Sequence, residues 1–474
     1  MATRSGTKND HQIDRARDAA LARLGMALAD WSERWFPDAF VFALVAILFV
    51  FVAGLLAGSA VRDLVKYFGD GFWILIPFTM QMAIIIIGGY VVAASPPVAS
   101  LIRGLAGLPR TPRTAVAFIA LFSMLTSLVS WGLSLIFSGF LVREIVKKVP
   151  GIDYRASGAA AYLGTGTVWA LGLSSSAALV MATPSSVPPA LLKISGVIPL
   201  SQTIYTWQSL TTACILMLSS VVMAYLSTPA SSTKTAESFG IAPGPQIRTI
   251  EERRTPAEWL EYAPLLSVAI GVVGLMYLVQ IYIARGPLAA LDLNTYNFLF
   301  LMVGLLLHWR PRSFIRAVND AVPATAGVLI QFPFYGGIFG IITMSSISLG
   351  LARFFVRHSS TSSYPVLVAL YSATLGMFVP SGGSKWIIEA PYVLQAAKDL
   401  HVNLGWVVQV YNTSEALPNL INPFWMLPLL GILKVRARDL IGYGLLYLSV
   451  NSVLVVFLMW FFARTFTYVP PVIP

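Results

Sequence analysis

Long uncharged stretches dominate this chain and restrict it to few kinds of fold. Residues 114–142 and 156–192 contain no Asp, Glu, Lys or Arg. A helix needs about 20 consecutive apolar residues to cross the hydrocarbon core of a bilayer. Only 11% of the 474 residues are charged, whereas charged residues make up about 25% of a typical soluble domain. The pattern predicts an all-α polytopic membrane protein.

Residues 114–142 predict a helical hairpin. As one helix they would measure roughly 43 Å, which is long for one crossing and too short for two. Ser130, Trp131 and Gly132 lie near the middle, and two half-helices meeting there would fit the length. One long tilted helix is the alternative. These three residues are candidates to line a substrate site, or they only cap the turn.

A second hairpin is predicted over residues 364–398. A proline and two glycines interrupt the helical pattern, since Pro lacks an N–H and Gly gains freedom when unfolded. Inside a bilayer, freed backbone groups are tolerated only where protein, water or a ligand satisfies them. The tip therefore predicts substrate contacts at Ser381, Gly382, Gly383 and Ser384. An ordinary kinked transmembrane helix is the alternative.

Residues 156–192 predict a broken spanning helix. Gly172 and a run of three serines lie at its centre. Ser174, Ser175 and Ser176 can satisfy freed backbone groups, and they can offer hydroxyls and N–H groups to a carboxylate. Close helix packing through small residues is the alternative.

The apolar run 402–433 is also broken, and it holds the polar residues Glu415, Asn419 and Asn422. Asn419 lies four residues after Glu415, on the same helix face, and is a candidate substrate ligand. Glu415 and Asn422 are candidates for ion coupling, with Glu415 as a proton carrier. A structural, hydrogen-bonded role for Glu415 is the alternative.

Lys385 and Glu389 place charge inside the second hairpin. They are four residues apart and share a helix face. Charge within a membrane is costly and usually functional. Either Lys385 binds the substrate carboxylate, or it pairs with Glu389 and is structural.

The distribution of basic residues predicts the topology. With the N-terminus cytoplasmic and both hairpins re-entrant, 23 of the 32 Lys and Arg residues face the cytoplasm and eight face outward, with Lys385 in the hairpin. Cytoplasmic loops carry the excess of Lys and Arg. The two halves then have opposite orientations, an inverted repeat typical of secondary transporters with a mid-membrane site.

Five segments follow from this topology. They are a cytoplasmic N-terminal segment with an amphipathic helix (1–37), the first inverted repeat (38–227), a cytoplasmic linker with a connecting transmembrane helix (228–291), the second inverted repeat (292–463) and a C-terminal tail (464–474).

Several stretches resemble the short-chain fatty acid transporter family of the ion transporter superfamily. They are residues 35–38, 130–133, 293–308, 379–383, 419–425 and 427–430. The resemblance implies an elevator-type carrier of short-chain monocarboxylates such as butyrate or acetoacetate, held between hairpin tips and broken helices. The sequence departs from the family pattern at Ser384, Lys385, Glu389 and Asn422.

We therefore expect a secondary carrier in the cytoplasmic (inner) membrane, coupled to H⁺ or Na⁺. Transport of another small organic anion such as a dicarboxylate, or an anion channel, is the alternative. The sequence has no nucleophile–base–acid set, no metal-ligand spacing and no phosphate loop, so we expect no enzyme, metal site or cofactor. The expected partners are a carboxylate, the lipid bilayer and, by analogy with elevator carriers, a second copy, but no nucleic acid.

The topology can be tested by cysteine accessibility. In a Cys214→Ser background, Arg436→Cys should resist impermeant thiol reagents in intact cells, because the charge asymmetry places this loop inside. Arg357→Cys, on the predicted outer side, is the matched control and should react. Rapid labelling at position 436 would contradict the topology.

Overall fold

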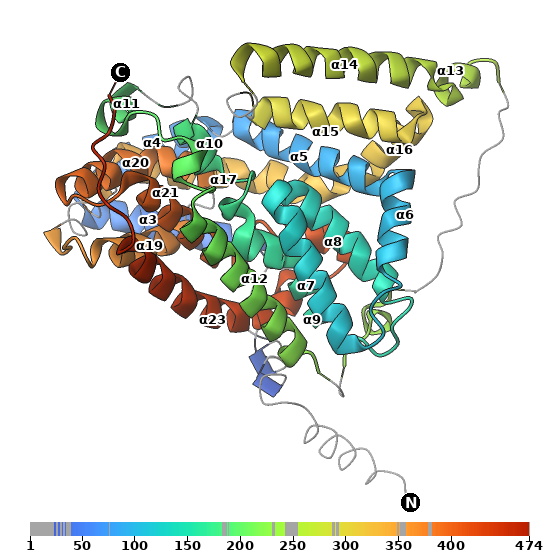
Figure 1. Ribbon diagram of the computed structural model, residues 1–474, viewed down its shortest axis with the longest axis horizontal. Coiled ribbons are helices and arrows are strands. Elements are labelled where there is room, and N and C mark those ends of the chain that lie inside the picture. The colour runs from blue at the N-terminus through green and yellow to red at the C-terminus, as the bar shows by residue number, and fades with distance from the viewer. Residues whose placement is uncertain are drawn as a thin grey trace, which may run out of the picture.

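The fold of the chain is entirely helical in the part that can be described (Figure 1). The computed structural model describes residues 23–24, 27–28, 31, 34, 39–74, 76–182, 187, 189–229, 233–241, 255–286, 290, 293–347, 350, 357–377 and 382–473. The all-α prediction is confirmed. The amphipathic helix predicted within residues 1–37 falls almost entirely outside the described residues.

Six described helical stretches are long and apolar enough to cross a membrane, or up to seven if one bent pair counts as a span. They are Pro112–Val129, Tyr154–Ala182, Trp207–Ser227, Pro264–Arg285, Pro311–Ile342 and Ala437–Ala463. Shorter apolar helices lie between them. The prediction of a multi-pass membrane protein is confirmed.

In the continuously described chain from Ala39 onward, four helices precede the first hairpin. They are α3 (Ala39–Leu56), α4 (Val61–Ile74), α5 (Ile76–Ala94) and α6 (Pro96–Leu105). The chain bends by 70° between residues 79–94 and 96–105. Ser95 has extended dihedral angles and Pro96 lacks an N–H, so α5 cannot continue straight into α6.

The predicted first hairpin is formed by α7 (Pro112–Val129) and α8 (Trp131–Ile145). Ser130 between them is extended, with φ −152° and ψ 117°, and its Oγ accepts a hydrogen bond from the N–H of Leu133. The Ser134 hydroxyl donates to the carbonyl of Ser123 at 2.7 Å, so α8 folds back along α7. The prediction of two half-helices that meet at residues 130–132 is confirmed.

The next span is broken where the sequence predicts. It comprises α9 (Tyr154–Leu163), the π-helical turn η1 (Gly164–Val168), the 3₁₀ turn η2 (Trp169–Leu171) and α10 (Ser176–Ala182), and α11 (Pro189–Ser195) follows. The first hairpin provides a hydrogen-bond partner for backbone freed at this break, because the N–H of Leu173 donates to the carbonyl of Leu128 at 2.8 Å. A Cβ at Gly172 would lie 2.3 Å from that carbonyl oxygen, so only Gly permits the approach.

The first half ends with α12 (Trp207–Ser227), preceded by the turn η3 (Leu200–Gln202), and α14 (Pro264–Arg285) connects it to the second half. Between them lie η4 (Ala236–Phe239) and α13 (Glu258–Tyr262). Asp153, at the start of α9, accepts hydrogen bonds from the backbone N–H groups of Ala156 and Lys234, which ties the linker to α9.

The second half of the chain contains the remaining described elements. It comprises α15 (Leu293–His308), α16 (Pro311–Ala321), η5 (Val322–Thr325), α17 (Ala326–Met344), α19 (Tyr364–Gly376), α20 (Gly382–Asp399), α21 (Leu404–Ala416), η6 (Leu417–Leu420), α22 (Leu427–Leu433) and α23 (Ala437–Ala463). Tyr371 and Tyr392 share a 2.8 Å hydrogen bond, so α20 runs back along α19 as the second hairpin. The chain breaks again between η6 and α22.

The two broken helices run through the interior, where every residue of α9 and α21 is buried. α14 and α15 lie side by side along one edge, next to α5, and α12 and α23 pack together on the other side (Figure 1).

α4 crosses α17 at a point where both helices have glycines. A Cβ at Gly71 would lie 2.5 Å from the carbonyl oxygen of Gly336 and 2.7 Å from the Cα of Gly340, so the two backbones are in direct contact. Small residues permit such close packing in membranes.

The crossing of α4 and α17 can be tested with neighbouring glycines. Gly71→Ala should lower the free energy of unfolding by about 1–3 kcal/mol, because its methyl group meets backbone that cannot move aside. Gly69→Ala on the same helix is the control, since a Cβ there has nothing within 4 Å. Thermal unfolding of the purified protein in detergent measures both. Equal midpoints for the two variants would contradict the packing.

Candidate functional site

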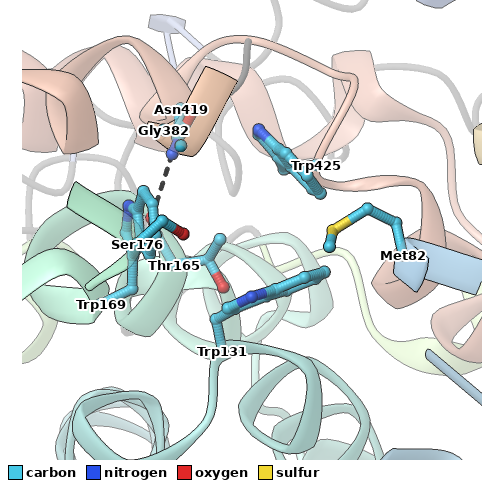
Figure 2. Close-up of a pocket in the computed structure, with 9 residues that line it drawn as sticks. Met82, Trp131, Thr165, Trp169, Ser176, Gly382, Asn419 and Trp425 are labelled. Carbon is cyan, nitrogen blue, oxygen red and sulfur yellow. Dashed lines mark hydrogen bonds between the residues drawn. The ribbon is translucent and has the colours of Figure 1, made fainter. Parts of the chain in front are cut away.

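A small cavity lies where both hairpins and both broken helices meet (Figure 2). Its volume is about 20 Å³, which is room for about one water molecule. The residues that line it are Met82, Trp131, Thr165, Trp169, Ser176, Gly382, Gly383, Asn419 and Trp425. None of these side chains carries a charge.

The first hairpin and the first broken helix are joined by Ser174. Its Oγ accepts a hydrogen bond from the N–H of Trp131 at 3.0 Å and donates one to the carbonyl of Ser127 at 2.8 Å. This fixes the indole of Trp131 at the cavity, where its ring meets the ring of Trp425 edge to face at 5.0 Å (Figure 2). Ser174 thus positions a wall residue without lining the cavity itself.

The tip of the second hairpin closes the cavity through its glycines. A Cβ at Gly382 would lie 2.4 Å from the ring of Trp169, and a Cβ at Gly383 would lie 3.3 Å from the Cβ of Ser176. Tyr411 of α21 donates its hydroxyl to the carbonyl of Gly382 at 2.7 Å. The start of α20 is therefore held against both broken helices.

Three polar atoms around the cavity lack a hydrogen-bond partner in the described part of the protein. They are Thr165 Oγ1, Trp169 Nε1 and Asn419 Oδ1, all buried. The amide nitrogen of Asn419 donates to the carbonyl of Thr165 at 3.4 Å, which links the two broken helices (Figure 2). Buried polar groups are almost always paired, so each of these atoms requires an explanation such as water or a ligand.

The structure brings part of the predicted site to the cavity. Trp131, Ser176, Gly382, Gly383 and Asn419 line it. Met82, Thr165, Trp169 and Trp425 also line it, and the sequence analysis did not select them. Thr165 and Trp169 lie in uncharged, apolar-looking sequence, so their only signal is proximity to the predicted break.

Other predicted residues lie beside the cavity. Ser130 caps α8, and Ser175 caps α10 by accepting from the N–H of Ala178 at 3.2 Å. Gly132 packs against α5, where a Cβ would meet the side chain of Ile85. Ser381 lies outside the described residues, as does the side chain of Ser384.

Lys385 does not line the cavity. Its Nζ lies 3.4 Å from Oε1 of Glu389, forms an ion pair with Glu415, and donates to the carbonyl of Ser372 at 2.7 Å. Lys385 and Glu389 have no exposed side-chain surface, and Glu415 is 1% exposed. The pairing of Lys385 with Glu389 was one of the two predicted alternatives, whereas the pairing with Glu415 was not anticipated. The three side chains are called the charged triad below.

Asn422 lies on the other side of the second break. Its amide nitrogen donates to the carbonyl of Met377 at 3.4 Å, and its Oδ1 accepts from the N–H of Phe424 at 3.0 Å. It borders a second, mainly apolar cavity of about 670 Å³ between α3, α19 and α23. A role of Asn422 in ion coupling stays a prediction.

The sequence profile of the short-chain fatty acid transporter family matches residues 20–462. The chain belongs to this family. The resemblance stated from the motifs is therefore confirmed, as is the prediction that the protein is a transporter and not an enzyme.

Curated relatives of this transporter cover nearly its whole length. A protein of Escherichia coli strain K12 is 33% identical over 439 residues, which is 92% of this chain and 98% of the relative. A protein of Haemophilus influenzae is 31% identical over 431 residues, which is 89% of this chain and 96% of the relative. Both are named "Putative short-chain fatty acid transporter".

Two solved structures align with this chain over most of its length. One is MtrF of Neisseria gonorrhoeae, described among antimetabolite efflux pumps, with 11% identity and a TM-score of 0.48 over 94% of this chain and 98% of that one. The other is the YdaH transporter of Alcanivorax borkumensis, with 16% identity and a TM-score of 0.47 over 92% of this chain and all of that one.

The positioning role of Ser174 can be tested against Ser176. Ser174→Ala should lower the free energy of unfolding by about 1–3 kcal/mol, because it leaves the N–H of Trp131 and the carbonyl of Ser127 without their partner. Ser176→Ala changes the cavity wall and should leave the unfolding midpoint in detergent unchanged. A smaller loss in Ser174→Ala than in Ser176→Ala would contradict the assignment.

Proposed function

We propose that this transporter is a secondary carrier of short-chain monocarboxylates, such as butyrate or acetoacetate, coupled to H⁺ or Na⁺. The observation that supports it most is the set of buried, unpartnered polar atoms around the cavity. Thr165 and Trp169 supply an O–H and an N–H that can donate to a carboxylate. The names of the curated relatives point to the same class of substrate.

The charges around the cavity favour one negative charge on the substrate. The N-terminal ends of α8 and α20, at Trp131 and Gly382, lie at the cavity, and the N-terminus of a helix attracts an anion. No Arg or Lys is among the lining residues, although Arg is the usual bidentate partner of a carboxylate. Neutral donors and helix ends suit a monocarboxylate better than a dicarboxylate.

The aromatic walls favour a short alkyl chain. The rings of Trp131 and Trp425 and the side chain of Met82 line one side of the cavity (Figure 2). The cavity is too small for a four-carbon acid as it stands. Substrate entry therefore requires that the hairpin tips move apart, and longer alkyl chains require a larger movement.

The order of the helices supports an inverted repeat. Each half contains a two-helix hairpin, then a helix broken near its middle, then a long final helix. Such paired broken elements frame the substrate sites of secondary transporters. We propose that the two halves have opposite orientations in the membrane. We also propose that the protein lies in the inner membrane with its N-terminus on the cytoplasmic side. An elevator-type movement and assembly as a homodimer belong to the same proposal.

Counterflow in proteoliposomes tests the function. Vesicles loaded with unlabelled butyrate should take up labelled butyrate through the purified protein, because a carrier exchanges substrate without net flux. Asn419→Ala and Ser176→Ala should each lower the rate by about tenfold, which corresponds to about 1.4 kcal/mol of lost stabilisation. Ser449→Ala, on an exposed part of α23, is the control and should retain the rate.

Other outcomes of this assay separate the alternatives. Counterflow of a dicarboxylate such as succinate, with none for acids of two to six carbons, would contradict the substrate. Uptake that is not accelerated by unlabelled substrate inside the vesicles would indicate an anion channel.

A further inference from the structure

The charged triad holds more acid than base. It contains two carboxylates, Glu389 and Glu415, and one ammonium group, Lys385, so its net charge is negative by one unit when all three are ionised. All three side chains are buried where the second hairpin packs against α21. Uncompensated charge within a membrane protein costs several kcal/mol, and one proton on either carboxylate would remove it.

We infer that the charged triad is the proton-binding site of this carrier, and that one H⁺ enters with each monocarboxylate. The inference rests on the proposed function and names its coupling ion. The proton forms an O–H bond with a carboxylate oxygen on the outer side and leaves the same oxygen toward the cytoplasm. No other bond changes, and one anion with one proton moves no net charge. The proton belongs to the pair of carboxylates and not to one of them.

The position of Lys385 disfavours a sodium ion here. A metal cation would need the oxygens that the ammonium group already contacts, namely those of Glu389, Glu415 and the Ser372 carbonyl. A second positive charge at that point would meet the ammonium at close range. A proton avoids this conflict, because it binds to one oxygen and does not need a coordination shell. The hydroxyl of Ser372 donates to Oε2 of Glu389 at 2.8 Å and can reorient when that carboxyl is protonated.

The other groups that face the triad are phenols, which are neutral at physiological pH. The ring of Tyr411 lies 4.8 Å from Nζ of Lys385, and Tyr371 and Tyr392 bond to each other beside Glu389. Tyr364 of α19 is a further phenol that interacts with Glu389. Other ionisable groups stand elsewhere on these helices and on the described elements packed against them. They are Lys193, Lys398, Asp399, Arg438, Asp439, Tyr443 and Tyr447. The exposed Lys193 and the paired Asp439 leave the triad's charge count unchanged.

The triad and the substrate cavity are joined through two helix ends. Gly382, which lines the cavity, lies three residues before Lys385 on α20, and Asn419 lies four residues after Glu415. Lys385 and Glu415 therefore hold the two cavity walls together. A proton on Glu415 weakens the attraction between α20 and α21, because the Lys385–Glu415 pair is the one that joins these two helices, and the start of α20 can then move when the anion arrives.

Uptake by proteoliposomes tests the site, with labelled acetoacetate as the probe. Acetoacetate is a stronger acid than butyrate, so less of it is in the neutral form that diffuses through lipid. The uptake by protein-free vesicles is subtracted to correct for this passive diffusion. An inward gradient of about one pH unit should concentrate it about tenfold, because a tenfold proton ratio supports a tenfold anion ratio. A sodium gradient at equal pH should concentrate none.

Two carboxamide variants connect this behaviour to the triad. Glu415→Gln and Glu389→Gln each fix its net charge at zero, like the protonated state. Counterflow by the unsubstituted protein should decline between about pH 6 and about pH 8, because the pair of buried carboxylates loses its proton in this range. Both variants should retain counterflow without this decline, and both should lose accumulation driven by the pH gradient. Glu237→Gln, on the exposed η4, is the matched control and should behave as the unsubstituted protein.

Each outcome points to one conclusion. Absence of counterflow in the unsubstituted protein contradicts the proposed function itself. Counterflow with accumulation driven by Na⁺ and not by H⁺ overturns the inference and leaves the function standing. Unchanged gradient-driven accumulation in both Gln variants also overturns it. If the variants fail to fold, proton uptake on acetoacetate binding decides: weakly buffered unsubstituted protein should take up protons, and no uptake overturns the inference.

Discussion

Backbone that is not helical has to be satisfied inside the membrane, and this requirement organises the structure. Each interruption of a helix exposes N–H and C=O groups that lipid cannot bond. Here the interruptions satisfy one another. Leu173 in the first broken helix donates to Leu128 at the tip of the first hairpin, and Tyr411 donates to Gly382 at the tip of the second. The breaks must therefore gather at one place, and a cavity results there.

Charge is kept out of that cavity and concentrated one helical turn away. The lining residues are neutral, while Lys385, Glu389 and Glu415 form ion pairs where the second hairpin packs against α21. Under the proposed function, an anion in the cavity would meet helix N-termini and neutral donors and no fixed positive charge. The triad has one more carboxylate than ammonium groups, and this excess is the basis of the proposal that it binds one proton.

Much of this arrangement could be predicted from the sequence, because the features that decide it are local. The apolar runs, the break at Ser130 and the break after Gly172 are visible in the sequence, and the structure has helix boundaries at these positions. The ion pair between Lys385 and Glu389 follows from their spacing on one helix.

The remaining features depend on contacts between distant segments. The only sequence signal of Thr165 and Trp169 is their proximity to the predicted break, since they reach the cavity through a π-helical turn and a 3₁₀ turn. The pairing of Lys385 with Glu415 joins two helices, and nothing in their spacing indicates it. The capping-box spacing of Thr255 and Glu258 predicts one helix that continues into the span at 263–283, but the structure has two helices, because Ala263 is extended before Pro264.

The most direct test of the account is binding of labelled butyrate to the purified protein, measured by scintillation proximity. Binding should saturate, other acids of two to six carbons should compete, and succinate should not. Thr165→Val keeps the shape of the side chain but removes the buried hydroxyl, and it should weaken binding by about tenfold or more, equivalent to about 1.4 kcal/mol. Equal competition by succinate, or unchanged affinity in Thr165→Val, would contradict a monocarboxylate site in this cavity.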